Sequence, residues 1–94
     1  MITKGISVIA EHFGLEMQLK QLQEESAELI VAASKFLRKR GDFDYMLPDS
    51  FADCSLNLTE ELADVLIVAY QIIDLLDAES QVKILCSRRL SERL

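Results

Sequence analysis

Ninety-four residues, half of them apolar, carry sixteen acidic and ten basic side chains, which give a formal net charge of −6. This length supports one hydrophobic core rather than two, so we expect a single domain over residues 1–94. Few glycines and one proline exclude a disordered chain, and the acidic balance excludes a basic surface for nucleic-acid polymers.

The first half of the sequence predicts two successive helices. Apolar residues spaced three and four apart over residues 1–13 predict a short helix that breaks near Gly14. The same period continues over residues 15–40 and predicts a long helix, which ends in a basic run before Gly41. This basic run either compensates the helix dipole or recruits phosphate.

The second half begins with a long connection. It covers residues 41–58, is rich in large apolar side chains, and is expected to contain a short helical turn near residues 50–54. A long helix is then expected to begin with a cap at Asn57 or Thr59 and to run to about Leu76.

A last helix, capped by Asp77 or Ser80, is expected to run to the end of the chain. The preceding helix is apolar nearly all round over residues 62–76, which a small bundle cannot cover by itself. We therefore predict an all-α, antiparallel bundle of about four helices that oligomerises through its long helices, as a homodimer or homotetramer.

Two pairs of carboxylates lie inside these apolar patterns. Glu25 and Glu28 are three residues apart, so they share one face of a helix. Glu61 and Asp64 have the same spacing on a later helix. A hard divalent cation such as Mg²⁺ or Ca²⁺, with Mn²⁺ also possible, would offset the repulsion within each pair. Antiparallel helices would bring all four carboxylates to one or two ions. The alternative is two solvated acidic faces.

Other metal centres lack their ligands. A di-iron carboxylate bundle needs Glu-x-x-His pairs, and the sequence has one histidine, His12. Cys54 and Cys86 lack the Cys-x-x-Cys spacing of a zinc site, so we expect free thiols in a reducing cytoplasm. Neither a signal peptide nor a membrane span is predicted, which favours a cytoplasmic location.

A resemblance to the MazG-type all-α nucleotide pyrophosphohydrolases is carried by HFGLEMQLKQLQEESAELIVAASK and LTEELADVLIVAYQIID, residues 12–35 and 58–74. That family's signature is a Glu-Glu-x-x-Glu helix followed by a Glu-x-x-Asp helix. The resemblance implies Mg²⁺-dependent hydrolysis of a nucleoside triphosphate, including deoxy or damaged ones, to the monophosphate and pyrophosphate. It implies that the metal and catalytic residues are Glu25, Glu28, Glu61 and Asp64.

Substrate contacts follow less directly from the resemblance. Relatives tend to place a basic residue for phosphate in the last helix, where this chain has Arg88, Arg89 and Arg93. Arg88 and Arg89 are the candidates for this contact. Lys20, shortly before the first motif, is a further candidate phosphate contact. The phosphoribosyl-ATP pyrophosphohydrolases have a similar helix pair, but their N-terminal Arg-Lys and Ser-Tyr-Thr features are missing. A non-catalytic helical dimerisation module is the alternative from a different class.

Overall fold

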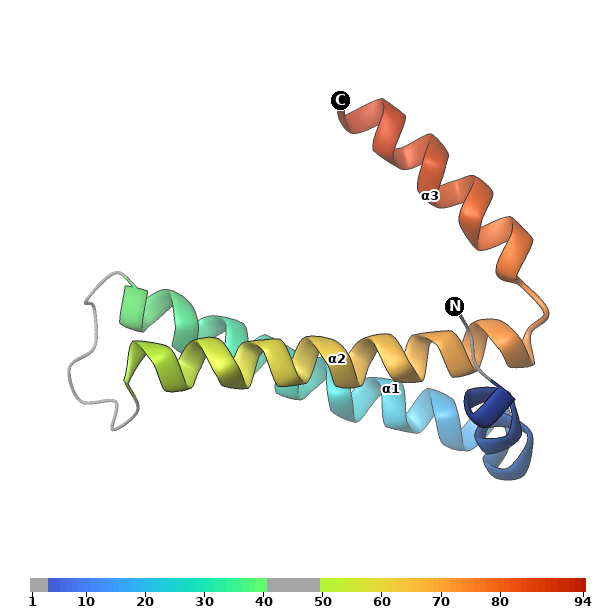
Figure 1. Cartoon of the computed structure of the whole chain (residues 1–94), viewed down its shortest axis with the longest axis horizontal. Helices are drawn as coiled ribbons and strands as arrows, with labels where there is room; N and C mark the ends of the chain where they lie inside the picture. The colour runs from blue at the N-terminus through green and yellow to red at the C-terminus, as the bar shows by residue number, and fades with distance from the viewer. Residues whose placement is uncertain (1–3, 41–49) are drawn as a thin grey trace.

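The chain folds into three helices, α1 (Lys4–Arg40), α2 (Phe51–Leu75) and α3 (Glu79–Arg93), in a computed structural model (Figure 1). The model describes the backbone of residues 4–40 and 50–94, and side chains from residue 14 onward within those ranges. No strand occurs in these ranges, so the predicted all-α class is confirmed. The described residues form three helices, the first of which is divided at Gly14, and the expected bundle of about four helices is not confirmed.

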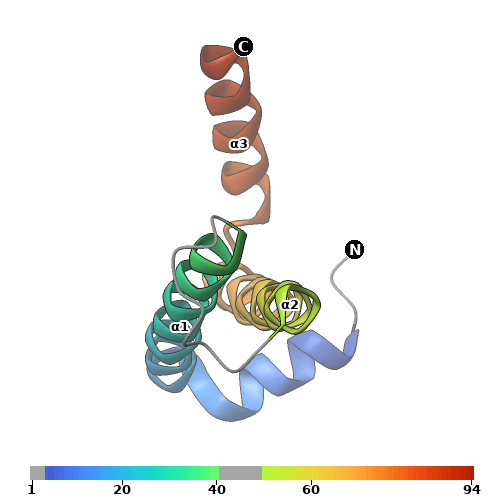
Figure 2. The same ribbon diagram turned by 90° about the vertical axis from the view of Figure 1, so that its left-hand side faces the viewer.

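Helices α1 and α2 run antiparallel and side by side along most of their length (Figures 1 and 2). Their contact is narrow, and the buried apolar residues are mostly small or medium in size: Ala32, Cys54, Val68 and Ile72. At one end of the pair, the rings of Phe36 and Phe51 lie 5.1 Å apart between centroids. This contact lies where α1 ends and α2 begins.

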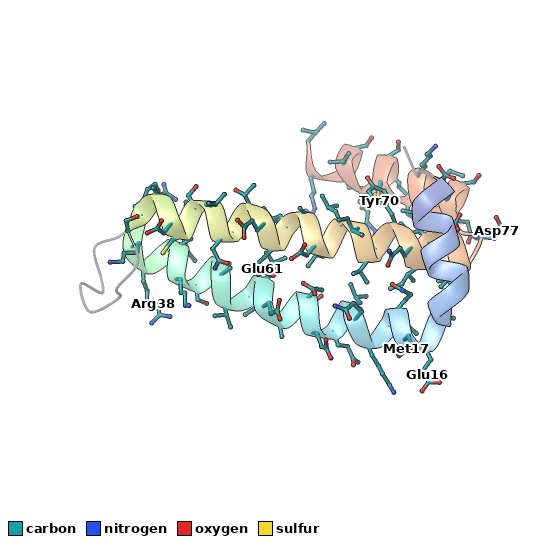
Figure 3. All side chains as sticks on the ribbon, turned by 60° about the horizontal axis from the view of Figure 1, so that its bottom comes forward. Glu16, Met17, Arg38, Glu61, Tyr70 and Asp77 are labelled. Atoms are coloured by element: carbon teal, nitrogen blue, oxygen red, sulfur yellow. The ribbon has the colours of Figure 1, made fainter. Side chains whose placement is uncertain are left out.

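Gly14 interrupts α1 where the sequence predicts a break. Its φ of 77° and ψ of 164° lie in a region that is open essentially to glycine alone, so the backbone turns sharply here. The segment before Gly14 crosses the end of the helix pair (Figure 3). The long helix expected over residues 15–40 is confirmed, with Arg38, Lys39 and Arg40 in its last turn.

Helix α2 begins earlier than the sequence pattern indicates. The Ser50 hydroxyl accepts a hydrogen bond from the Asp53 backbone N–H at 3.1 Å, and the Asp53 carboxylate accepts one from the Ser50 N–H at 3.3 Å. This reciprocal capping box makes the predicted start at Asn57 or Thr59 wrong. Thr59 instead donates to the Ser55 carbonyl inside the helix, at 2.9 Å. Residues 41–49 of the predicted connection lie outside the described residues.

The turn between α2 and α3 also differs from the prediction. Asp77 has a φ of 50°, in the left-handed region, and the helix cap falls at Ala78 without a side-chain hydrogen bond. Backbone bonds close the turn instead, from the Ala78 N–H to the Ile73 carbonyl at 3.0 Å and from the Asp77 N–H to the Asp74 carbonyl at 3.1 Å. The predicted caps Asp77 and Ser80 are therefore wrong.

None of the helices in the described part of the chain combines the length and the apolar character that crossing a membrane requires.

Candidate metal centre

Polar residues form a matching stripe on each of the two paired helices. On α1 the stripe is Gln18, Gln21, Glu25 and Glu28, and on α2 it includes Glu61, Asp64 and Gln71. Spacings of three and four residues on α1, and of three and seven on α2, keep each stripe on one side of its helix. Because the helices are antiparallel, the two stripes run along each other in opposite directions.

Three carboxylates meet between the helices. One oxygen each from Glu25, Glu28 and Glu61 lies within 4.8 Å of the other two, and Figure 3 shows Glu61 between α1 and α2. Glu25 and Glu61 are half-buried, and Glu28 is exposed. The predicted convergence of acids from two helices is thus seen for three of the four residues. Asp64 is exposed and lies outside this group of three.

Two oxygen atoms of this cluster are buried without a hydrogen-bond partner, Glu25 Oε2 and Glu61 Oε2. The other oxygen of Glu25 accepts a hydrogen bond from Gln21 Nε2 at 2.7 Å, which orients the carboxylate. A buried acceptor without a partner is unfavourable, and more so when it is charged. A cation held by these oxygens would remove that cost.

The electrostatics of the cluster act most strongly on Glu61. Burial raises the pKa of this carboxyl above its usual value, because a low-dielectric surrounding disfavours the charged form. Glu28 raises the same pKa further, by charge repulsion and by a side-chain hydrogen bond to the protonated form. Repulsion from Asp64 and then Glu25 adds to the effect. The position therefore favours a bound proton or a bound cation over a bare negative charge.

The three atoms that could ligate a metal ion are all carboxylate oxygens, which suit hard cations such as Mg²⁺ and Mn²⁺. Both cysteines are free thiols, as predicted; Cys54 is buried and Cys86 is exposed on α3. Among the described residues, no other group of three possible ligands comes this close together.

The predicted phosphate contacts are not gathered at the cluster. Lys20 is exposed on α1 and forms an ion pair with Glu16 at 3.5 Å. Arg88 and Arg89 are exposed on α3, which contacts α2 alone among the described helices and rises away from the helix pair (Figure 1). Within one chain, the structure brings none of these three cations to the carboxylates.

Sequence reasoning missed the two buried glutamines, Gln18 and Gln71, which are 5% and 6% exposed. Each stands ten residues from a cluster carboxylate, Gln18 before Glu28 and Gln71 after Glu61. Gln18 Oε1 is also buried without a partner. The regular polar spacing on each helix was a signal for these positions, but the leucines Leu15 and Leu19 gave a stronger apolar pattern. Both leucines are exposed in the folded chain.

Comparison with known proteins identifies no relative: neither a family model, nor a curated protein, nor a solved structure matches the chain. The functional argument therefore depends on the site and on the motifs that form it.

Proposed function

We propose that the protein is a Mg²⁺-dependent nucleoside triphosphate pyrophosphohydrolase, which releases the nucleoside monophosphate and pyrophosphate. The observation that carries this proposal is the meeting of Glu25, Glu28 and Glu61 from two helices, with two buried oxygens that have no partner. These residues are the acidic positions of the two motifs that resemble the MazG-type enzymes. The substrate class comes from that resemblance.

The residues of the cluster have distinct roles in this proposal. Glu25, Glu28 and Glu61 would hold Mg²⁺, and Asp64, one turn after Glu61 on α2, would join them from the exposed side. The bound ion would neutralise phosphate charge and lower the pKa of an attacking water. Gln21 would keep Glu25 in its ligating orientation through the hydrogen bond at 2.7 Å.

The proposal includes a homodimer or homotetramer, for which the exposed side chains of α2 provide the support. Leu62, Leu66 and Ile67 are 46–54% exposed, although the sequence pattern predicted burial on more than one side of this helix. A second subunit would bury them. It would also supply the walls that a narrow helix pair lacks around a bound nucleotide, and its basic side chains could contact the phosphates.

A Mg²⁺-dependent assay of pyrophosphate release tests the activity directly. The panel contains the common ribonucleoside and deoxyribonucleoside triphosphates, damaged deoxynucleotides and phosphoribosyl-ATP. We expect release from at least one triphosphate, and its loss in EDTA. Release from phosphoribosyl-ATP alone would indicate that the protein is a phosphoribosyl-ATP pyrophosphohydrolase instead. A folded protein that is inert on the whole panel would contradict the enzymatic proposal and favour a non-catalytic dimerisation module.

A further inference from the structure

Helix α3 has almost no support from its own chain. All of its residues are described, and none is buried. Ile84, Leu85 and Leu90 are 44–62% exposed. An isolated helix of 15 residues is marginal in water, because most helical stability in proteins comes from packing of an apolar face. A helix with these side chains therefore calls for a partner surface.

The whole chain exposes more surface than a compact monomer of its size. It exposes 7262 Å², whereas a folded monomer of 10.6 kDa exposes about 5,500 Å². Its radius of gyration is 16.3 Å, against about 12 Å for a compact domain of 94 residues. The excess of about 1,800 Å² is more than the roughly 800 Å² that each partner buries in a stable interface. The chain thus has surface to cover by association.

Helix α3 rises away from α2 (Figures 1 and 2), and side chains of these two helices line a groove. Its volume is about 510 Å³, and it is lined by Tyr70, Ile73, Glu79, Val82, Lys83, Cys86, Ser87 and Leu90. Glu79 and Lys83, the charged residues of the lining, form an ion pair with each other at 3.3 Å. The rest of the lining is largely apolar, so the groove fits an amphipathic helix better than a charged small molecule.

The charges around the groove indicate which charges the bound helix should have. Three acidic residues lie around the turn that joins α2 to α3, Asp74, Asp77 and Glu79, and Glu79 also lines the groove. The last turn of α2 contains no basic residue to complement the helix dipole. A matching occupant is an amphipathic helix with a basic end. The second half of α3 is such an end, because it contains Arg88, Arg89 and Arg93, with Glu92 as the one acid.

We propose that the groove of each chain binds α3 of a second copy, with the two α3 helices antiparallel about a two-fold axis near Cys86. Cys86 is the midpoint of α3, so an antiparallel pair centred there places Val82 opposite Leu90 of the partner subunit. The same register places Glu79 opposite Arg93 of the partner subunit, and symmetry repeats each contact. This inference adds an interface to the proposed homo-oligomer and does not depend on catalytic activity.

Cross-linking at Cys86 tests this arrangement on the full chain. Helix axes in contact are about 8–10 Å apart, so a short bis-maleimide is a better probe than a disulfide. Cys54 is 2% exposed and should not compete. We expect most of the protein to become covalent dimer, the same result for Cys54→Ser, and none for Cys86→Ser.

A moved thiol is the matched control. Ser91 is exposed on α3, five residues from Cys86 and therefore on another side of the helix. The double variant Cys86→Ser/Ser91→Cys should give less than about a tenth of the cross-linked dimer, because its thiols are not opposed across the axis. Equal cross-linking of both positions would indicate random collision and would overturn the proposal.

Light scattering and charge reversal complete the test. Wild type should have at least the mass of a dimer at micromolar concentration. Arg93→Glu alone, or Glu79→Arg alone, should raise the dissociation constant of the dimer about fivefold or more. The double variant should return within about twofold of wild type, because the opposed pair is restored in reverse. A monomeric wild type would overturn both this interface and the proposed oligomer. An oligomer without the Cys86 link would overturn the α3 interface alone, and the pyrophosphate assay would remain independent of either result.

Discussion

Glu61 is the residue on which the carboxylate cluster depends most. It comes from α2, whereas Glu25 and Glu28 come from α1, so it alone joins the two helices within the group of three. Its Oε2 is buried without a partner, and its pKa is raised by burial and by the acids around it. Two testable consequences follow from this position, one for turnover and one for stability.

Replacing Glu61 with glutamine keeps the size of the side chain and removes a charged ligand. We expect pyrophosphate release by Glu61→Gln to fall by about 100-fold or more, since one ligand of a joint metal site is lost. Glu28→Gln should do the same, and the double variant should be little worse than either single one. Glu16→Gln, at an exposed ion pair with Lys20, should stay within about threefold of wild type. Normal turnover by Glu61→Gln would contradict the site.

The raised pKa of Glu61 makes the metal-free protein pH-sensitive. The unfolded carboxyl titrates near the ordinary glutamate pKa of about 4.5, and the folded one titrates above it. The folded state therefore binds the proton more tightly, so this stabilising effect is present below about pH 4.5 and is lost as pH rises through the raised pKa. In EDTA, the melting temperature should fall more steeply for wild type than for Glu61→Gln as pH rises from the ordinary pKa of glutamate through the raised pKa of Glu61. Equal slopes would show that Glu61 is not perturbed.

At the scale of the helix, the start of α2 is decided by capping chemistry. Ser50 and Asp53 satisfy each other's backbone N–H groups, and Phe51 follows the cap at once to pack against Phe36. The chain thus gains almost two turns of helix before Asn57, where the sequence pattern places the start.

Removing the Ser50 cap should therefore destabilise the protein. Ser50→Ala should cost about 1 kcal/mol, which lowers the melting temperature by about 4–8 °C in a domain of this size. Asn57→Ala is the matched control, because inside a helix alanine is the better helix former and stability should be unchanged or slightly raised. A melting temperature lower for Asn57→Ala than for Ser50→Ala would indicate that the helix begins at Asn57.

At the scale of the whole molecule, a divalent cation should link α1 to α2. In the proposed site it would bind the folded arrangement of Glu25, Glu28 and Glu61, which the unfolded chain lacks, and it would therefore stabilise the native state. At 100 times its dissociation constant, the gain is about 2.7 kcal/mol.

We therefore expect the melting temperature to rise with millimolar Mg²⁺ or Mn²⁺. NaCl of equal ionic strength is the control that separates specific binding from screening of the net charge of −6. Glu61→Gln should lose most of the rise. A melting temperature that responds equally to NaCl and MgCl₂ would indicate solvated acidic faces.

Local patterns in the sequence determined much of this protein. The helical class and the break at Gly14 depend on residues within four positions of each other. The same holds for the faces shared by two pairs of acids, Glu25 with Glu28 and Glu61 with Asp64. Such relations can be read from spacing, because backbone hydrogen bonds set them within one helix.

Tertiary structure decided what depends on partners far along the chain. The antiparallel register of α1 and α2 brought Glu61 to Glu25 and Glu28, left Asp64 outside the group of three, and buried Gln18 while Leu15 and Leu19 stayed exposed. It also left α3 standing apart with its arginines away from the acids. Spacing cannot supply these facts, because packing between helices determines which side of each apolar pattern faces inward.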